Sequence, residues 1–426
     1  MFDTEEFLVP LTAKKALLLS DSEWGLEELE GLLTTMGGEA TEKLKLPHRR
    51  IDPGTYIGKG KLDEVKAILE AKQLDLLLVD FDLSPSQLRN IATHLKCLVL
   101  DRSGIILEIF ARHARTKESK LQVEMARLEY LMPRLAHMWS HFERQKGSGG
   151  GALKGKGMGE TQIEVDRRLV KDRINALRRK MSDVEDARKL HRRHRSSMLK
   201  VAIVGYTNAG KSTLLNALTH SDVLVEDALF ATLDATVRLL NPKSRPAVLG
   251  IDTVGFIDRL PHTLVASFRS TLGEVLEADL LVHVLDASHP EVQRHYAVTM
   301  EVLKELGADQ IPMQVVFNKI DRATDLGLLK IWAAGLAREE NAQQPIFMSS
   351  LKVEDVDNCR SRIMKYFEKS MEVIEILIPY EDGKMISQIY ELGHIESKKE
   401  TEKGLFFRLR TLPEFAKQLN LARYKI

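Results

Sequence analysis

One run of eight residues constrains this chain of 426 residues more than any other feature. It follows the apolar stretch 199–204, which has the pattern of a buried parallel strand, and it precedes a helical pattern at 213–218. The run reads Gly205-Tyr206-Thr207-Asn208-Ala209-Gly210-Lys211-Ser212. Glycines in such a turn let backbone N–H groups point inward, where they cradle phosphates at the start of a helix. The run therefore predicts an α/β domain of the P-loop type, with a mainly parallel sheet, flanking helices and a nucleoside triphosphate site.

The chemistry around the phosphates is assigned to this run and to a second motif. Lys211 is expected to reach the β- and γ-phosphates, and the Ser212 hydroxyl is expected to bind Mg²⁺. A later apolar run ends in Asp252-Thr253-Val254-Gly255. Asp252 would hold the metal through its water shell, and the Gly255 N–H would meet the γ-phosphate. Lys211 and Gly255 are therefore candidate catalytic residues.

A segment between these motifs has the character of a switch loop. It reads Phe230-Ala231-Thr232-Leu233-Asp234 and is followed by more threonine. In such loops a threonine joins the metal only while the γ-phosphate is present. We favour Thr232 as this metal ligand and as a catalytic residue, with Thr236 in reserve. The alternative is that Thr232 is simply a solvated loop residue.

The base is predicted from a third motif. The apolar stretch 311–317 ends in Asn318-Lys319-Ile320-Asp321. A carboxylate at 321 can accept hydrogen bonds from N1–H and the 2-amino group of guanine, whereas adenine would leave it unpaired. Asn318 would steady the loop and Lys319 would lie along the ring. Backbone contacts to the base are assigned to Ser349-Ser350-Leu351. The predicted substrate is GTP.

Phe256 follows Gly255 at the position where many small GTPases carry a glutamine that orients the attacking water. A phenylalanine side chain neither donates nor accepts a hydrogen bond in this role. We therefore expect the isolated protein to hydrolyse GTP slowly and a partner to complete the reaction centre.

Composition excludes several classes of protein. The two cysteines, Cys97 and Cys359, lie far apart and match no metal spacing, which favours a reducing compartment. The start of the chain is acidic and unlike a signal peptide. No apolar run approaches the roughly 20 residues that span a bilayer. The sequence predicts a cytoplasmic protein that is monomeric in solution, with peripheral membrane association left open.

The pattern along the chain predicts four domains. Residues 1–112 alternate strand-like and helix-like stretches, and 113–198 favour an antiparallel helical hairpin. Residues 199–370 would form the GTPase domain, and 371–426 a small α+β module with strands at 374–378 and 405–410 around a helix at 383–392. Apolar residues at heptad-like spacing would form the hairpin seam: Leu121, Met125, Leu128, Met132 and Leu135 on one helix, and Ile163, Val170, Ile174, Leu177, Met181 and Val184 on the other.

Charge is concentrated on one part of a nearly neutral chain. Residues 144–200 carry 17 Lys and Arg against 7 Asp and Glu, whereas the net charge of the whole chain is +1. Within this segment, the predicted tip of the hairpin at 147–159 has seven glycines. Such a tip is either a flexible loop or a cationic element that enters folded RNA, where glycine permits close approach.

Three stretches resemble the HflX family of GTPases, and the likeness extends over essentially the whole chain. They are Gly157-Met158-Gly159-Glu160-Thr161-Gln162-Ile163-Glu164-Val165-Asp166-Arg167-Arg168, Leu100-Asp101-Arg102-Ser103-Gly104-Ile105-Ile106-Leu107-Glu108-Ile109-Phe110 and Lys120-Leu121-Gln122-Val123-Glu124. The resemblance implies a GTPase that binds the large ribosomal subunit and its RNA and, in bacteria, splits stalled ribosomes during stress such as heat shock. The tip at 147–159 would then approach the peptidyl-transferase region, and ribosomal RNA would replace the missing glutamine.

The chain matches the family at Phe256, where the family also has a hydrophobic residue, and departs from it at two places. Ser349-Ser350-Leu351 stands where Ser-Ala-Lys is usual, and Ala152-Leu153-Lys154 interrupts the glycines of the tip. Two other functions stay open. One is a regulatory GTPase with a different RNA or protein partner. The other adds ATP-driven RNA remodelling by the N-terminal domain, whose turn at 58–61 (Gly-Lys-Gly-Lys) would touch phosphates.

Overall fold

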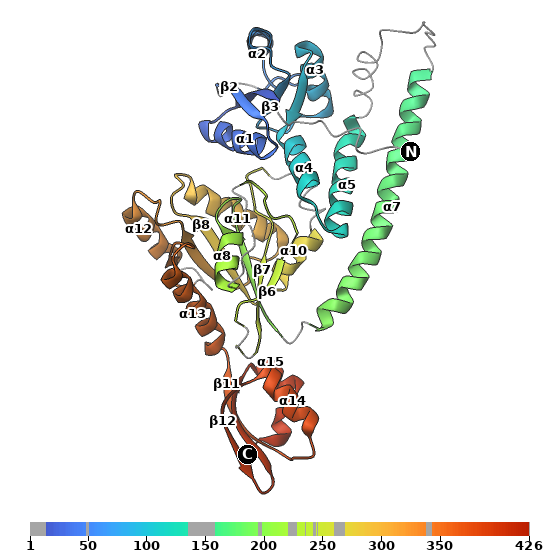
Figure 1. Ribbon diagram of the computed structural model, residues 1–426. Helices are drawn as coiled ribbons and strands as arrows, with labels where there is room; N and C mark the ends of the chain where they lie inside the picture. Colours follow the sequence, from blue (N-terminus) through green and yellow to red (C-terminus); the bar gives the residue numbers. More distant parts are fainter. Residues whose placement is uncertain are drawn as a thin grey trace. The chain divides into compact units, whose positions relative to one another are not determined.

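The computed structural model describes residues 14–47, 51–134, 158–194, 198–219, 228–234, 236–241, 244, 246–259, 269–337 and 343–425 (Figure 1). The chain divides into two compact units. The first unit consists of Met1–Glu185, Ala228–Leu233 and Arg259–Phe268, and the second of Asp186–Asp227, Asp234–Asp258 and Arg269–Ile426. Two short segments from the middle of the GTPase sequence thus belong to the first unit.

The first unit is built on a four-stranded parallel sheet with the strand order β2-β1-β3-β4. The central strands are runs of leucine that are fully buried, as expected for a sheet covered on both faces. Because the chain pairs β2 on one side of β1 and β3 on the other, the loops after β1 and β3 lie at the switch point of the topology. The elements are β1 (Lys15–Ser20), α1 (Glu23–Thr35), β2 (Glu39–Lys45), α2 (Lys59–Lys72), β3 (Leu76–Val79), α3 (Pro85–Leu95) and β4 (Leu98–Asp101).

Local sequence sets where α3 begins. The Ser84 side chain accepts a hydrogen bond from the Gln87 N–H, and the Gln87 side chain accepts one from the Ser84 N–H. This capping box and the proline at the first helical position fix the start of the helix. The turn at 58–61 opens α2, with Gly58 at its N-cap.

Three helices complete the described part of the first unit, and α5 and α7 lie side by side (Figure 1). Leu121, Leu128, Val170, Ile174 and Leu177 form one apolar cluster between them, so these members of the predicted seam pack together. Met125, Met132, Met181 and Val184 pack against that cluster. The helices are α4 (Arg102–His113), α5 (Lys117–Leu131) and α7 (Met158–His194), with a 3₁₀ turn η2 (Met132–Arg134). Met158 and Gly159 open α7; the rest of the predicted glycine-rich tip, 147–157, and the seam residue Leu135 lie outside the described residues.

The second unit contains a six-stranded sheet with the order β10-β9-β8-β5-β7-β6, parallel except for β6. Its central strands are buried along their length, which confirms the mainly parallel α/β fold with flanking helices. The strands are β5 (Leu199–Gly205), β6 (Thr236–Leu239), β7 (Val248–Asp252), β8 (Leu280–Asp286), β9 (Met313–Asn318) and β10 (Ile346–Phe347). The helices are α8 (Lys211–Thr219), α10 (Arg269–Leu276), α11 (Val292–Leu306), α12 (Leu326–Leu336) and α13 (Val353–Lys369).

The end of the chain forms an antiparallel sheet of order β11-β13-β12 with a core of its own. Both predicted strands and the predicted helix are present, and the sequence pattern missed β12. That strand reads His-Ile-Glu-Ser-Lys-Lys-Glu-Thr and is mostly exposed, so it has no apolar alternation to reveal it. The elements are β11 (Glu372–Ile378), α14 (Gly383–Leu392), β12 (His394–Thr401), β13 (Gly404–Thr411), α15 (Pro413–Gln418) and η3 (Leu421–Tyr424).

Across the described ranges, the helices are too short or too polar to cross a membrane.

Candidate nucleotide-binding site

The phosphate loop joins β5 to α8, and two of its glycines are required by its geometry. Gly205 has φ +147° and Gly210 has φ +92°, in the region that side chains disfavour. A Cβ at Gly205 would lie 2.3 Å from the Val284 carbonyl oxygen, and one at Gly210 would lie 2.4 Å from the Asn318 amide nitrogen. The loop therefore keeps this shape only with glycine at both positions.

Lys211 is the first residue of α8, and its side chain folds back over the loop. Its Nζ donates a hydrogen bond to the Tyr206 carbonyl at 2.8 Å, and the residue is 6% exposed. Burial lowers the pKa of Lys211 to about 8, although the Asp252 carboxylate acts in the opposite direction. Phosphate oxygens would add counter-charge beside this buried ammonium.

Ser212 and Asp252 bring two oxygen ligands together. The Ser212 hydroxyl donates to Asp252 Oδ2 at 2.6 Å, and Asp252 is 3% exposed at the end of β7. In the part of the chain that the structure describes, no group of three or more His, Cys, Asp and Glu side chains is arranged to hold a metal ion. The Ser212 and Asp252 oxygens are of the kind that Mg²⁺ prefers, and this ion takes its remaining ligands from water and substrate phosphates.

The segment after β7 lies against the phosphate loop. Phe256 N–H donates to the Gly205 carbonyl at 3.1 Å, and Thr207 N–H donates to the Phe256 carbonyl at 2.7 Å. A Cβ at Gly255 would lie 2.8 Å from Thr207 Cα and 3.0 Å from Lys211 Nζ. Gly255 is therefore placed next to the lysine assigned to the γ-phosphate, and only glycine fits this closely.

Tyr206 braces the same segment, and the sequence did not reveal this role. Its hydroxyl accepts a hydrogen bond from the Asp258 N–H at 2.7 Å, and its ring stacks on His295 with centroids 3.8 Å apart. Arg294 donates to the Asp258 carboxylate at 2.6 Å. Burial, followed by the nearby His289, lowers the pKa of His295 to about 3, so the stacked ring is neutral at physiological pH. Both partners come from α11, which has no recognisable motif.

The guanine motif is tied to the phosphate loop through Asn318. This residue is 2% exposed; its amide donates to the Ala209 carbonyl at 3.0 Å, and its carbonyl oxygen accepts the Ser350 N–H at 3.0 Å. Lys319 donates to the Asn208 carbonyl at 2.7 Å and pairs with Asp286 at 2.8 Å. The structure thus brings together residues that are over a hundred positions apart in the sequence.

Asp321 remains exposed at the end of this motif, where a base can reach it. A hydrogen bond from the Ser349 side chain lowers the pKa of Asp321, which keeps the carboxylate ionised as an acceptor. Leu351 is 72% exposed beside it. The Ser349-Ser350-Leu351 loop therefore supports Asp321, and its backbone contacts to guanine stay a prediction.

Thr232 differs from the residues above. It is part of the segment Ala228–Leu233 in the first unit, whereas Ser212 and Asp252 belong to the second. It is partly buried and Asp234 follows it within the described residues, whereas position 235 lies outside them. The choice between Thr232 and Thr236 as metal ligand stays a prediction.

Comparison with known proteins agrees with this geometry. Three family profiles match: a GTP-binding GTPase N-terminal region at 23–111, a GTP-binding GTPase middle region at 113–195 and a 50S ribosome-binding GTPase at 200–319.

Curated relatives named GTPase HflX match over most of the chain. One from Gluconacetobacter diazotrophicus is 45% identical and covers 80% of this chain and 73% of its own. One from Caldanaerobacter subterraneus is 41% identical and covers 94% of this chain and 90% of its own. One from Escherichia coli is 38% identical and covers 89% of this chain and 87% of its own. With the phosphate loop and the guanine motif assembled in one fold, this chain belongs to the HflX family of GTPases and is an enzyme that hydrolyses GTP.

Proposed function

We propose that this protein binds the large ribosomal subunit, which completes its reaction centre, and that it splits or rescues stalled ribosomes under stress such as heat shock. The observation that carries the proposal is the state of Phe256. Its side chain is 1% exposed, and both its backbone hydrogen-bonding groups pair with the phosphate loop. The position that orients water in many small GTPases therefore offers no polar side chain, and we assign this task to the partner.

We propose one role for each residue of the nucleotide site. Asp321 would accept hydrogen bonds from guanine, Lys211 would contact the β- and γ-phosphates, and the Gly255 N–H would meet the γ-phosphate. Ser212 would bind Mg²⁺ directly, Asp252 through water, and Thr232 would join when the γ-phosphate is present. The metal would neutralise charge on the phosphate oxygens.

The nature of the partner is argued from charge and from the relatives. The family profile that matches residues 200–319 is that of ribosome-binding GTPases. Several cations on α7 are exposed: Arg167, Arg168, Lys171, Arg179 and Lys180. RNA phosphates attract such a surface, and the attraction falls as salt rises. The glycine-rich tip at 147–159 would enter the subunit beyond it.

The first experiment measures GTP turnover of the full chain with and without purified large ribosomal subunits. We expect the subunits to raise kcat at least about tenfold, because a partner that supplies transition-state contacts acts on the chemical step. Small subunits serve as the control, and Lys211→Ala shows that the turnover comes from this site. An unchanged rate with large subunits would remove the proposed mechanism and favour a regulatory GTPase with another RNA or protein partner.

The second experiment separates binding from splitting. Intact ribosomes are sedimented with the protein and GTP, GDP or a non-hydrolysable GTP analogue. We expect subunit peaks to grow with GTP or the analogue and not with GDP. Co-sedimentation without separation of subunits would retain ribosome binding and reject splitting.

A further inference from the structure

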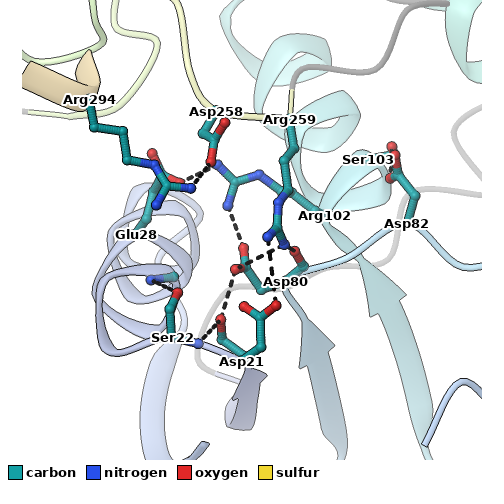
Figure 2. Close-up of polar contacts among 12 residues, drawn as sticks. Asp21, Ser22, Glu28, Asp80, Asp82, Arg102, Ser103, Asp258, Arg259 and Arg294 are labelled. Carbon is teal, nitrogen blue, oxygen red and sulfur yellow. Dashed lines mark hydrogen bonds and ion pairs between the residues drawn. The ribbon is translucent and has the colours of Figure 1, made fainter. Parts of the chain in front are cut away.

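A group of charged side chains lies at the carboxyl ends of β1 and β3 in the first unit (Figure 2). Arg102 is 1% exposed and donates to Asp80 Oδ1 at 2.5 Å and to the Glu28 carboxylate. The Ser20 hydroxyl donates to the other Asp80 oxygen at 2.8 Å. These residues, with Asp21 beside them, are called the carboxylate cluster below.

The cluster holds more negative than positive charge. Glu28 and Asp80 are both buried, and both pair with the single guanidinium of Arg102. Two carboxylates buried next to each other are costly unless cations lie close to both. A second cation at this place is therefore favourable.

Arg259 supplies that second cation (Figure 2). Its Nη1 donates to the Asp80 carbonyl oxygen at 2.9 Å and lies 3.7 Å from Asp80 Oδ2. Its Nη2 lies 3.7 Å from the Asp21 carboxylate. The contact between Arg259 and Asp80 spans 179 positions of sequence. Arg259 stands only four residues after Gly255, the predicted γ-phosphate contact.

The predicted switch loop around Phe230 is held within the first unit by an aromatic contact and a hydrogen bond. Phe230 is 1% exposed, and its ring meets the edge of Phe110 with centroids 4.7 Å apart. The preceding Leu229 N–H donates to the Thr35 hydroxyl at 3.2 Å. Phe230 stands two residues before Thr232, the predicted metal ligand.

Both anchors sit in backbone that side chains disfavour. Phe230 has φ +57° and Arg259 has φ +52°. Non-glycine residues keep such conformations only when the surrounding contacts hold them there. The conformations of the two segments are therefore coupled to the contacts that the first unit makes with Phe230 and Arg259.

We propose that Arg259 and Phe230 are positioning residues through which the first unit biases the nucleotide state. While they are anchored, the chain after β7 favours the arrangement in which Phe256 pairs with the phosphate loop and Lys211 bonds the Tyr206 carbonyl. A γ-phosphate that draws on Lys211 and on the Gly255 N–H must disturb this arrangement. Anchoring thus favours GDP over GTP, and by reciprocity GTP weakens the anchors. This inference rests on the roles proposed for Lys211 and Gly255 at the γ-phosphate and is independent of the ribosome.

The test compares affinities of the full chain for GDP and for a non-hydrolysable GTP analogue, with Mg²⁺ present. We expect Arg259→Ala to shift the ratio toward the analogue by about fivefold or more. Arg259→Lys keeps the positive charge but lacks the planar guanidinium, so its ratio should lie between those of the wild type and Arg259→Ala. Phe230→Ala should shift the ratio in the same direction, because it releases the other segment.

Two further variants make the result decisive. Asp21→Asn weakens the contact to Arg259 and leaves the Asp80–Arg102 pair in place, so a smaller shift in the same direction is expected. Arg423→Ala removes an exposed arginine from the C-terminal region and should change nothing. An unchanged ratio in folded Arg259→Ala and Phe230→Ala proteins, or an equal loss of affinity for both nucleotides, would overturn the proposal.

Discussion

In the second unit β5 ends at Gly205 and leads into a glycine-rich turn, whereas in the first unit β1 ends at Ser20 and leads into a turn of Asp21 and Ser22. Both strands are central members of parallel sheets whose loops meet at the carboxyl edge. In the first unit the Ser22 hydroxyl accepts the Gly25 N–H at 3.0 Å, and a Cβ at Gly25 would lie 2.1 Å from Asp80 Oδ2. The start of α1 is therefore occupied by the protein's own acidic side chain.

The comparison shows that strand order decides where the loops meet, whereas the residues of the loops decide what binds there. Parallel strands bring loops together at one edge, which is where such sheets bind ligands. At β5 the loop offers backbone N–H groups and a lysine, a combination that attracts phosphates. At β1 and β3 the loops offer carboxylates, a combination that attracts a guanidinium. Similar topology therefore serves catalysis in one unit and, by our proposal, control in the other.

The largest expected effect is a change in the base specificity of the nucleotide site. Asp321→Asn should move preference from GTP toward xanthosine triphosphate by a combined factor of about 10⁴, because the amide matches a carbonyl where guanine has an amino group. Competition binding of the two nucleotides measures it. Retained preference for GTP would remove the role assigned to Asp321.

The next prediction tests whether only the second unit hydrolyses nucleotide. Lys211→Ala should lower kcat for GTP by about 10² to 10³, since the variant loses a charged contact to the phosphates. The matched variant Lys59→Ala, in the turn before α2, should leave turnover unchanged. ATP hydrolysis that survives Lys211→Ala and is lost in Lys59→Ala would instead assign a second nucleotide site to the first unit.

A third prediction breaks the carboxylate cluster itself. Arg102→Ala should lower the free energy of opening of β1 and β3 by about 3–5 kcal/mol, because it removes the guanidinium that pairs with the buried Glu28 and Asp80 carboxylates. Amide hydrogen exchange in these strands gives the measurement. Asp63→Ala, which removes an exposed partner of His94, should cost less than about 1 kcal/mol. Equal exchange in the two variants would show that the cluster does not stabilise the sheet.

The smallest expected effect is the pH dependence of GTP affinity, which comes from the buried Lys211 of the phosphate loop. The pKa of Lys211 is lowered to about 8, so this group loses its charge above that pH in the free protein. Phosphates favour the charged form, and binding above pH 8 must therefore take up a proton. Affinity for GTP should fall by up to about tenfold between pH 7 and 9. Calorimetry in buffers of different ionisation enthalpy measures the proton uptake; no uptake at pH 9 would contradict the assignment.

Much of the fold and of the candidate site was predictable from local sequence. The phosphate loop, the run at 252–255 and the guanine motif are contiguous, and each follows an apolar strand. The position of Asn318 between the phosphate loop and Ser350 follows from the requirement that parallel strands end at the same edge. The polar strand β12 was missed because an exposed strand carries no apolar signal. The division of the chain into four domains stays a prediction.

The sequence by itself determined that this chain binds and hydrolyses GTP, because glycine spacing, a lysine and a guanine-reading carboxylate are properties of short segments. Only the tertiary structure decided what holds those segments in place. The brace from Tyr206 to Asp258, the pairing of Arg102 with two distant carboxylates and the anchoring of Arg259 at Asp80 join residues 22 to 179 positions apart. No local pattern encodes such contacts, since burial and charge compensation exist only once the sheet has assembled.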